Sequence, residues 1–469
     1  FRHLFVWPKL NKSLTKSYRR ATPSNIDETS SGSLPRSARL TPPSFRAVGF
    51  FHNSNKAESM HISITTELLG EHPPLLDIEI PEIHDDALTS WVRGGDGLIG
   101  FGIYKSHVVK GAHRFEQARQ WWREHVNGLD IHNNVHGTGT GPILFTSFAF
   151  DEAEDSVLII PKVVVGQRNG KSWITWIGAT PQPALHKAPH RSLPLEMSWS
   201  GSNGDVWQDR VARSVEKIKN ESLEKIVLAR FITGTSEKKI NQRNLLRQLA
   251  SEYPSTWVYS NHGLVGATPE LLVRLSKSLI TSRILAGTIR KTGDDERDLA
   301  LAGSLARSSK DLEEHEYAVR SVADALSPFC TSTNVPETPF VLHLSNVMHL
   351  ATDVTGVLAD STNPTDIFEL VSRLHPSAAV CGTPTDLAKR TIDEIEGISR
   401  GRYAGPIGWI DAKGDGELGI ALRCGQISHD ASSIRIYAGC GIVAGSDPER
   451  EYAESQAKLL PMRSALEKH

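Results

Sequence analysis

The sequence has few cysteines and no long apolar run. Its 469 residues contain four cysteines, which are far apart and show no C-x-x-C spacing: Cys330, Cys381, Cys424 and Cys440. This usage argues against a zinc site and a disulfide framework, and it favours a reducing compartment. No stretch approaches the roughly 18 consecutive apolar residues that a transmembrane helix needs. We therefore expect no membrane span and four small, partly buried thiols.

Neither positive nor negative charge predominates in the sequence. The formal net charge is −2, so nothing global points to nucleic acid or an anionic membrane as a partner. The sequence contains no G-x-x-x-x-G-K-[ST], no H-E-x-x-H and no G-x-S-x-G motif. The glycine-rich run 137–141 is followed by Pro142 and a strand-like segment. Without a helix N-terminus to hold a phosphate, we predict a loop there.

Residues 1–59 differ from the remainder of the chain. They contain ten Lys or Arg against three acidic residues and are rich in serine, threonine and proline, which predicts disorder. The chain begins with Phe1, and Met60 opens the first orderly segment. Either this leader is an organelle transit peptide or it is an upstream extension from a mis-assigned start. We favour the extension, and with it a cytoplasmic location.

From Met60 onward strands and helices interleave, which predicts an α+β fold with antiparallel sheet. We expect one catalytic domain over 60–469, with an N-terminal portion 60–200 and a motif-rich portion 201–469. The predicted helices are Val206–Asn220, Lys310–Leu326 and Pro448–Lys468. The predicted strands are Trp91–Tyr104, Ile143–Phe150, Ser156–Val165 and Lys225–Ile232, followed by an antiparallel meander of Tyr403–Ile410, Glu417–Ile427 and Ser433–Gly441.

Carboxylates recur near predicted helix starts. In S-D-P-E-R-E-Y-A-E, Ser446 with Glu449 fits a capping box, which places Glu451 and Glu454 on one helical face. In K-D-L-E-E-H, Asp311 and Glu314 have the same spacing. Two such pairs facing each other could hold a hard divalent cation, since Mg²⁺ prefers oxygen ligands. On spacing alone, acids that complement the helix dipole explain the pattern more often.

Three further residues have both an ordinary and a functional explanation. Lys225 heads the apolar strand E-K-I-V-L-A-R, where a snorkelling surface lysine is common. Arg423 lies within A-L-R-C-G, where it is either a buried structural arginine or a fork for a carboxylate. Glu270 follows Thr268 and Pro269 at the start of an apolar run.

Together these segments resemble the chorismate-utilising enzymes, the family of isochorismate, salicylate, anthranilate and aminodeoxychorismate synthases. The similarity spans roughly residues 91–466 and is densest after Leu223. The matching motifs, in order, are E-K-I-V-L-A-R, G-A-T-P-E-L-L, L-A-G-T, K-D-L-E-E-H, N-V-M-H-L, H-P-S-A-A-V-C-G-T-P, Y-A-G-P-I-G-W, A-L-R-C-G and A-G-C-G-I-V-A-G-S-D-P-E-R-E-Y-A-E.

The resemblance implies two packed, mainly antiparallel sheets with helices outside, and a Mg²⁺ site in a deep cleft. It assigns Lys225 as the general base that activates water and Glu270 as the general acid. It assigns Glu314 and Glu454 as metal ligands, with Asp311 and Glu451 completing the site. The implied substrate-binding residues are Gly287, Thr288, His349, Ala379, Tyr403, Arg423, Gly439, Gly441 and Lys458.

Within the family, the segment P-S-A-A-V-C-G favours an isochorismate synthase. Ala379 stands where ammonia-using and salicylate-forming relatives tend to have threonine, and the N-terminal feedback motif of the anthranilate enzymes is missing. We therefore expect chorismate as substrate, Mg²⁺ as cofactor, and a monomer that needs no glutaminase subunit. A salicylate synthase, an anthranilate-type subunit and a non-catalytic chorismate-binding protein are the alternatives. Ile284 in place of proline and Cys440 in place of alanine depart from the family pattern, and we expect both to be tolerated packing changes.

Overall fold

The computed structural model describes residues 62–83, 87–179, 181–189, 194–201, 203–359 and 365–467. Residues 59–469 belong to one compact unit. The basic leader predicted over 1–59 lies outside the described residues. Within them, no helix is both long and apolar enough to cross a membrane.

One sheet has thirteen strands and is almost entirely antiparallel, β1 and β6 being the one parallel pair recorded in its described part. We call it the thirteen-stranded sheet. Its order along the sheet is β12 (Ser198–Gly201), β13 (Lys225–Thr235), β25 (Ser433–Ile442), β24 (Cys424–Ile427), β15 (Leu264–Thr268), β14 (Trp257–Asn261), β3 (Leu88–Arg93), β4 (Asp96–Phe101), β9 (Val163–Arg168), β10 (Lys171–Ile177), β1 (Ile62–Leu69) and β6 (Leu129–Asn133), with β21 (Gly382–Thr383) paired to β13.

The second sheet, which we call the ten-stranded sheet, is antiparallel. Its order is β18 (Cys330–Asn334), β20 (Val347–Leu358), β17 (Leu279–Arg290), β16 (Leu271–Ser276), β23 (Gly416–Ile420), β22 (Pro406–Asp411), β7 (Ile143–Ser147), β8 (Ser156–Ile160) and β5 (Lys105–Val109), with β19 (Phe340–His343) paired to β20. A small separate sheet joins β2 (Ile78–Glu79) and β11 (His186–Lys187).

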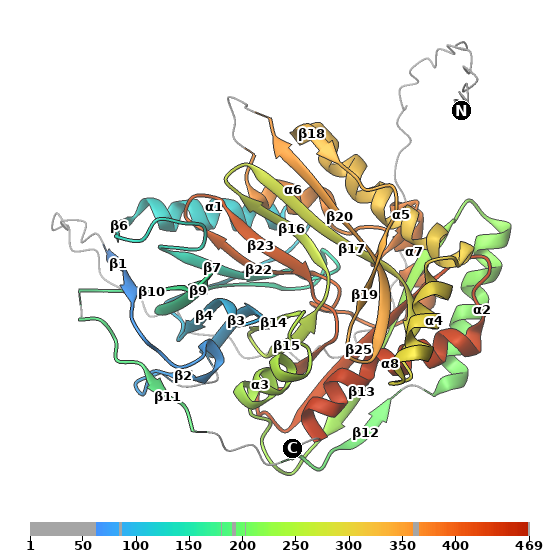
Figure 1. The fold of residues 1–469 in the computed structure, drawn as a ribbon, viewed down its shortest axis with the longest axis horizontal. Helices are drawn as coiled ribbons and strands as arrows, with labels where there is room; N and C mark the ends of the chain where they lie inside the picture. The colour runs from blue at the N-terminus through green and yellow to red at the C-terminus, as the bar shows by residue number, and fades with distance from the viewer. Residues whose placement is uncertain are drawn as a thin grey trace, which may run out of the picture. The chain divides into compact units, whose positions relative to one another are not determined.

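The helices lie outside the sheets (Figure 1). Helix α5 (Ser309–Leu326) packs on β17 and β20, while α3 (Gln242–Glu252) and α8 (Pro448–Glu467) pack on the thirteen-stranded sheet. The others are α1 (Arg114–Asn127), α2 (Gly204–Asn220), α4 (Asp295–Leu305), α6 (Ile367–Leu374) and α7 (Thr385–Glu396), with 3₁₀ turns at Leu75–Asp77 and Ser327–Phe329. The predicted α+β class with two mainly antiparallel sheets is confirmed.

Strand alternation divides the core in two. Trp91 on β3 and Trp409 on β22 belong to a core shared by both sheets, whereas Val92, the next residue along β3, packs on the other face of its sheet against α3 and α8. Successive strand side chains point to opposite faces, so one strand serves both cores. This burial of both faces explains why β13 and β15 are almost continuously apolar.

Two predicted strands turn out to be pairs. Segment 91–104 contains a hairpin, because Gly94 and Gly95 adopt positive φ angles of 57° and 90° and form the tight turn between β3 and β4. Segment 156–165 is broken at Pro161, and its halves β8 and β9 enter different sheets. Proline cannot donate to a strand ladder, and it interrupts this one.

The predicted C-terminal meander is wrong, because its strands do not all lie in one sheet. Strands β22 and β23 lie in the ten-stranded sheet, whereas β24 and β25 lie in the thirteen-stranded sheet. Segment 417–427 is therefore two strands, and the chain changes sheet between Ile420 and Cys424. Arg423, at the crossing, has a φ of +48°, an unusual angle for a residue with a side chain.

The helix starts agree with prediction except for one cap. Pro448 is the first residue of α8, but Asp447 rather than Ser446 accepts the hydrogen bond from the backbone N–H of Arg450 (3.0 Å). Ser446 instead accepts from the N–H of Val443. The helix register is unchanged, so Glu451 and Glu454 keep the predicted spacing.

A buried ion pair joins α7 to β13. The carboxylate of Glu396 accepts from Arg400 Nε (2.7 Å) and Nη2 (2.6 Å), and from the N–H of Ala229 (2.8 Å). Arg400 also donates to the carbonyls of Val227 and Val380. Both partners are almost fully buried, so removing one would leave an uncompensated charge in the core.

We predict that Glu396→Gln lowers the free energy of unfolding by about 3–5 kcal/mol, the usual cost of breaking a buried pair. Urea denaturation monitored by circular dichroism measures this change. The matched control is Glu316→Gln, which removes the exposed partner of Arg320 on α5 and is expected to cost about 0.5 kcal/mol or less. Equal effects of the two substitutions would contradict a special role for the buried pair.

Candidate active site

A small cavity gathers most of the predicted site residues. Strands β13 and β25 of one sheet and β17 and β20 of the other contribute to its wall, together with α5 and α8. All nine predicted substrate-binding residues line it, as do the predicted acid and one predicted metal ligand: Gly287, Thr288, His349, Ala379, Tyr403, Arg423, Gly439, Gly441, Lys458, Glu270 and Glu314. Residues from Glu270 to Lys458 thus meet at one place.

Lys225 lies behind this wall, and it is not among the lining residues. It is the first residue of β13, is fully buried, and its Nζ lies 3.4 Å from Oε1 of Glu314. The contact is an ion pair without hydrogen-bond geometry. A side chain at Gly441 would overlap Oε1 of Glu314 and come within 3.1 Å of Cε of Lys225. Glycine at 441 therefore makes the meeting of these two charges possible.

Glu270 is a buried carboxyl group in the cavity wall. It directly precedes β16, and its N–H donates to Oγ1 of Thr268 (3.2 Å). Burial raises the pKa of Glu270 to about 8, even though Lys225, Arg423 and Lys458 oppose the shift. A carboxylic acid that stays protonated near neutral pH can donate a proton to a leaving group.

Arg423 and His349 form a hydrogen-bonded unit in the same wall. Nη2 of Arg423 lies 3.1 Å from Nε2 of His349, and Nδ1 of His349 lies 3.1 Å from Oγ1 of Thr288. Because a guanidinium can only donate, Nε2 must accept and the imidazole is neutral. Burial, followed by the charges of Arg423 and Lys458, lowers the pKa of His349 well below its usual value. The imidazole thereby holds the guanidinium beside the cavity.

Tyr403 and Lys458 complete this side of the cavity. The Tyr403 ring stacks on Tyr437 with centroids 5.0 Å apart, and Nζ of Lys458 donates to the carbonyl of Gly439 (3.0 Å). A side chain at Gly439 would come within 2.9 Å of the Tyr403 hydroxyl. Two cations, Arg423 and Lys458, thus line one small cavity, as binding of an anionic substrate would require.

The acidic residues meet only in part. Ligand atoms of Glu451, Glu454 and Cys440 lie within 4.8 Å of one another, and within the described ranges no other such group of metal-ligating side chains is found. Burial and the charge of Glu454 raise the pKa of Glu451 to about 7, although Nζ of Lys310 lies 2.9 Å away. Glu314 and Asp311 fall outside this group. Asp311 lies instead in the first turn of α5, where its N–H donates to Ser308.

Sequence reasoning missed several functional candidates. Arg400 lines the cavity while it pairs with Glu396, and no motif in its loop signals this. Lys310 is the first residue of the motif K-D-L-E-E-H, and the motif alone does not assign it a role. Cys440 stands where the family usually has alanine, and the sequence alone assigns it no role, although it lies only eleven residues before Glu451.

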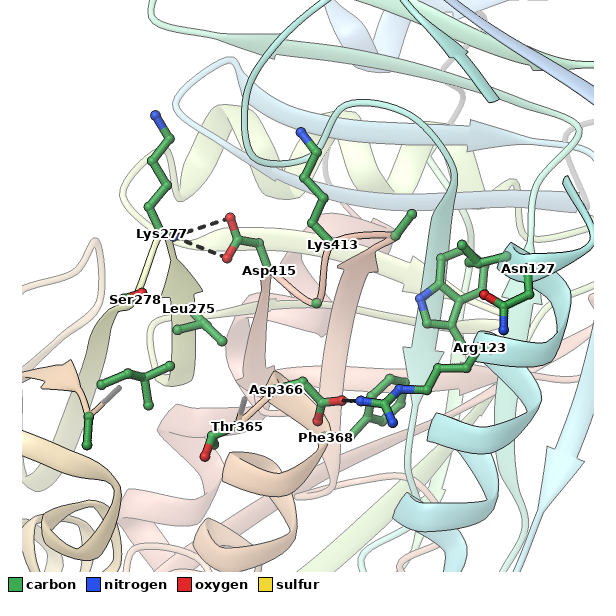
Figure 2. A pocket seen from close by; sticks show the side chains of 16 residues that line it. Arg123, Asn127, Leu275, Lys277, Ser278, Thr365, Asp366, Phe368, Lys413 and Asp415 are labelled. Carbon is green, nitrogen blue, oxygen red and sulfur yellow. Dashed lines mark hydrogen bonds and ion pairs between the residues drawn. The ribbon is translucent and has the colours of Figure 1, made fainter. Parts of the chain in front are cut away.

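A second, larger hollow contains none of the predicted residues (Figure 2). Its polar side chains include the ion pair of Arg123 with Asp366 (3.1 Å), while Lys277 and Lys413 are exposed and extend away from Asp366. The carboxylate of Asp415 accepts from the backbone N–H of Lys277. Surface lysines beside satisfied carboxylates provide no acid or base, so the smaller, buried cavity is the candidate active site.

Comparison with known proteins identifies the family. The family model described as chorismate binding enzyme matches residues 180–467. The isochorismate synthase MenF of Bacillus subtilis is 36% identical over 405 residues, which cover 79% of this chain and 85% of that protein. The isochorismate synthase DhbC of the same organism is 34% identical over 64% of this chain and 82% of that protein.

Solved structures give the same result for the fold. A Bacillus anthracis protein assigned as a 2,3-dihydroxybenzoate-specific isochorismate synthase, DhbC, superimposes with a TM-score of 0.69 at 30% identity, covering 82% of this chain and 98% of that one. The menaquinone-specific isochorismate synthase MenF of Escherichia coli has a TM-score of 0.69 at 22% identity, covering 86% and 94%. The resemblance inferred from the motifs is confirmed, and the chain belongs to the chorismate-binding enzyme family.

Proposed function

We propose that this protein is an isochorismate synthase, which moves a hydroxyl group of chorismate from C4 to C2. The observation that carries the proposal is Glu270: a buried carboxylic acid with a pKa of about 8 in a cavity that also holds Arg423 and Lys458. The isochorismate synthases among its relatives match most of its length, which supports the same reaction.

Two cations are well suited to hold the substrate. Chorismate carries two carboxylates, and the guanidinium of Arg423 can bind one of them through two parallel hydrogen bonds. His349 contacts this guanidinium only at Nη2, so the other N–H groups of Arg423 can donate to the carboxylate. Lys458 supplies a point charge nearby, and the Tyr403 hydroxyl can donate to the same group. With its charges held in this way, the ring would be fixed relative to Glu270.

The proton transfers follow from the acid and the base. Lys225, with its amine deprotonated and the ion pair with Glu314 thereby broken, would take a proton from a water that attacks C2. Glu270, protonated, would give its proton to the C4 hydroxyl, which leaves as water while the ring double bond shifts. One water is added and one is lost, so the reaction is an isomerisation. General acid and base catalysis of this kind typically contributes about 10²–10⁴-fold each to the rate.

The acidic cluster fits a divalent cation. Its oxygen donors suit Mg²⁺, and burial together with the charge of Glu454 raises the pKa of Glu451. Glu451 and Glu454 would hold the ion, with Glu314 at the cavity wall and Asp311 as a neighbour. Bound there, Mg²⁺ would offset the charge of a substrate carboxylate.

The cavity lining favours water over ammonia as the nucleophile. Ala379 and the apolar Val380 and Leu285 line it, and none of them provides a hydroxyl that could orient ammonia. We propose that the chain works without a glutaminase subunit. The monomeric state and the cytoplasmic location stay predictions.

A chromatographic product assay tests the function. We expect chorismate and Mg²⁺ to give isochorismate, also from the reverse direction, with no effect of ammonium. EDTA should abolish turnover and added Mg²⁺ should restore it, because the ion would offset the charge of a substrate carboxylate. Salicylate with pyruvate as products, or anthranilate formed only with ammonium, would assign a sister activity instead. Full turnover in EDTA would refute the metal site.

The pH dependence should report Glu270. The group is active when protonated, so its contribution to kcat/KM should be complete below its pKa and be lost as the pH rises through about 8. Glu270→Gln keeps the shape but has no proton to transfer, and should lower kcat by about 10²–10⁴-fold. If the residual activity of this variant kept an alkaline limb near pH 8, another group would be the acid.

Gly441→Ala should disable the base without unfolding the protein. The added methyl overlaps Glu314 and crowds Lys225, and a displacement of about 1 Å at a catalytic group can cost about 10²-fold in rate. Gly445→Ala is the matched control, because a side chain there meets nothing within 4 Å. We expect kcat to fall only in the first variant, at an unchanged melting temperature. Wild-type kcat in Gly441→Ala would contradict the role of the Lys225–Glu314 contact.

A further inference from the structure

The thiol of Cys440 lies beside the two glutamates at the start of α8. Its Sγ and the carboxylates of Glu451 and Glu454 lie within 4.8 Å of one another, close enough for one ion to contact all three. Cys440 and Glu451 are 1% and 2% exposed, so both are fixed in a packed region. The Cys440 S–H also donates to the carbonyl of Glu451 at 3.3 Å, which holds the sulfur at the first turn of the helix.

The strand directs this sulfur away from the substrate. Gly439 and Gly441 line the cavity, and Cys440 stands between them on β25. Since strand side chains alternate, that of Cys440 points to the opposite face, toward α8. The thiol therefore approaches the glutamates from the side of the strand that faces away from the cavity. It can bind an ion there without occupying the space of the proposed substrate.

A sulfur donor changes which ion the cluster prefers. Mg²⁺ is bound in proteins through oxygen atoms and gains nothing from a thiol. Zn²⁺ takes cysteine sulfur and carboxylate oxygen readily, usually with four ligands, and thiolates select softer metals generally. One sulfur and two carboxylates would give three protein ligands and leave a position for water.

The neighbouring cations do not prevent this. Lys310 pairs with Glu451 through Oε1, and Lys458 pairs with Glu454 through Oε1, so the second oxygen of each carboxylate has no recorded cationic partner. The Lys310 side chain is 39% exposed and can swing toward solvent when an ion arrives. A dication bound by two carboxylates and a thiolate, whose proton is released to solvent, would carry one net negative charge, which Lys458 beside Glu454 offsets.

We propose that Cys440, Glu451 and Glu454 form a binding site for Zn²⁺, and that Zn²⁺ bound there excludes Mg²⁺ from the same glutamates. The exclusion of Mg²⁺ rests on the proposed function, whereas the zinc site does not. The enzyme would thus be inhibited by zinc through Cys440, which stands where the family usually has alanine.

Zinc binding to the purified full-length chain tests the site without any turnover. Competition with a chromogenic chelator should give one tight site in the wild type, and Cys440→Ala and Cys440→Ser should each weaken it by about tenfold or more. X-ray absorption at the zinc edge should show a Zn–S distance of about 2.3 Å in the wild type and none in either variant. Cys330→Ser is the matched control, because Cys330 lies on β18 outside the cluster, and it should bind zinc like the wild type.

Separate results would overturn the two halves of the proposal. A tight zinc site that persists in Cys440→Ala, or a wild-type spectrum with oxygen and nitrogen neighbours only, refutes the zinc site. If zinc binds through sulfur but does not raise the Mg²⁺ concentration needed for half-maximal rate, the exclusion of Mg²⁺ is refuted. Because binding is measured without chorismate, failure of the zinc site and failure of the isochorismate synthase assignment are distinguishable.

Discussion

The antiparallel pairing of β13 with β25 is the constraint on which the site depends. Its register places Val227 opposite Gly441 and Ala229 opposite Gly439, so small residues face the cavity from both strands. The two glycines leave room for Glu314 and Tyr403, respectively. Lys225, at the head of β13, is paired with Thr383 of β21 and is fully buried. Shifting this register by one residue would turn Cys440 into the cavity and the glycines away from it.

Much of the fold could be predicted because its signals are local. Caps, apolar stripes and charged first turns marked α2, α5 and α8, and apolar runs marked β7 and β13. What could not be predicted was the sheet to which a strand belongs. Segment 417–427 is mostly apolar and predicts a single strand. It is divided between the two sheets near Arg423, whose positive φ no sequence pattern reveals. Sheet membership is decided by long-range pairing, on which local propensity is silent.

The candidate site shows the same division. Motif order was enough to gather eleven predicted residues around one cavity. It could not show that Lys225 stands behind the wall rather than in it, because that depends on the size of residue 441 on a different strand. Nor could motif order show that Asp311 lies apart from the group of Cys440, Glu451 and Glu454. Asp311 and Glu314 have helical spacing, but Asp311 lies beside Gly287 and Glu314 reaches Lys225. A shared helical face does not ensure a shared partner.

Charge balance explains why so many ionised groups can be buried here. Each of three glutamates faces a lysine from another element or another turn: Glu314 with Lys225, Glu451 with Lys310, and Glu454 with Lys458. Buried ions are tolerated when they are paired, but pairing seldom adds net stability over apolar packing. Retaining six charges in one region is therefore better explained by function than by folding. Lys458 illustrates the link, because the ammonium that neutralises Glu454 also lines the substrate cavity. One ammonium thus lines the candidate active site and pairs with the helix that carries the acidic cluster.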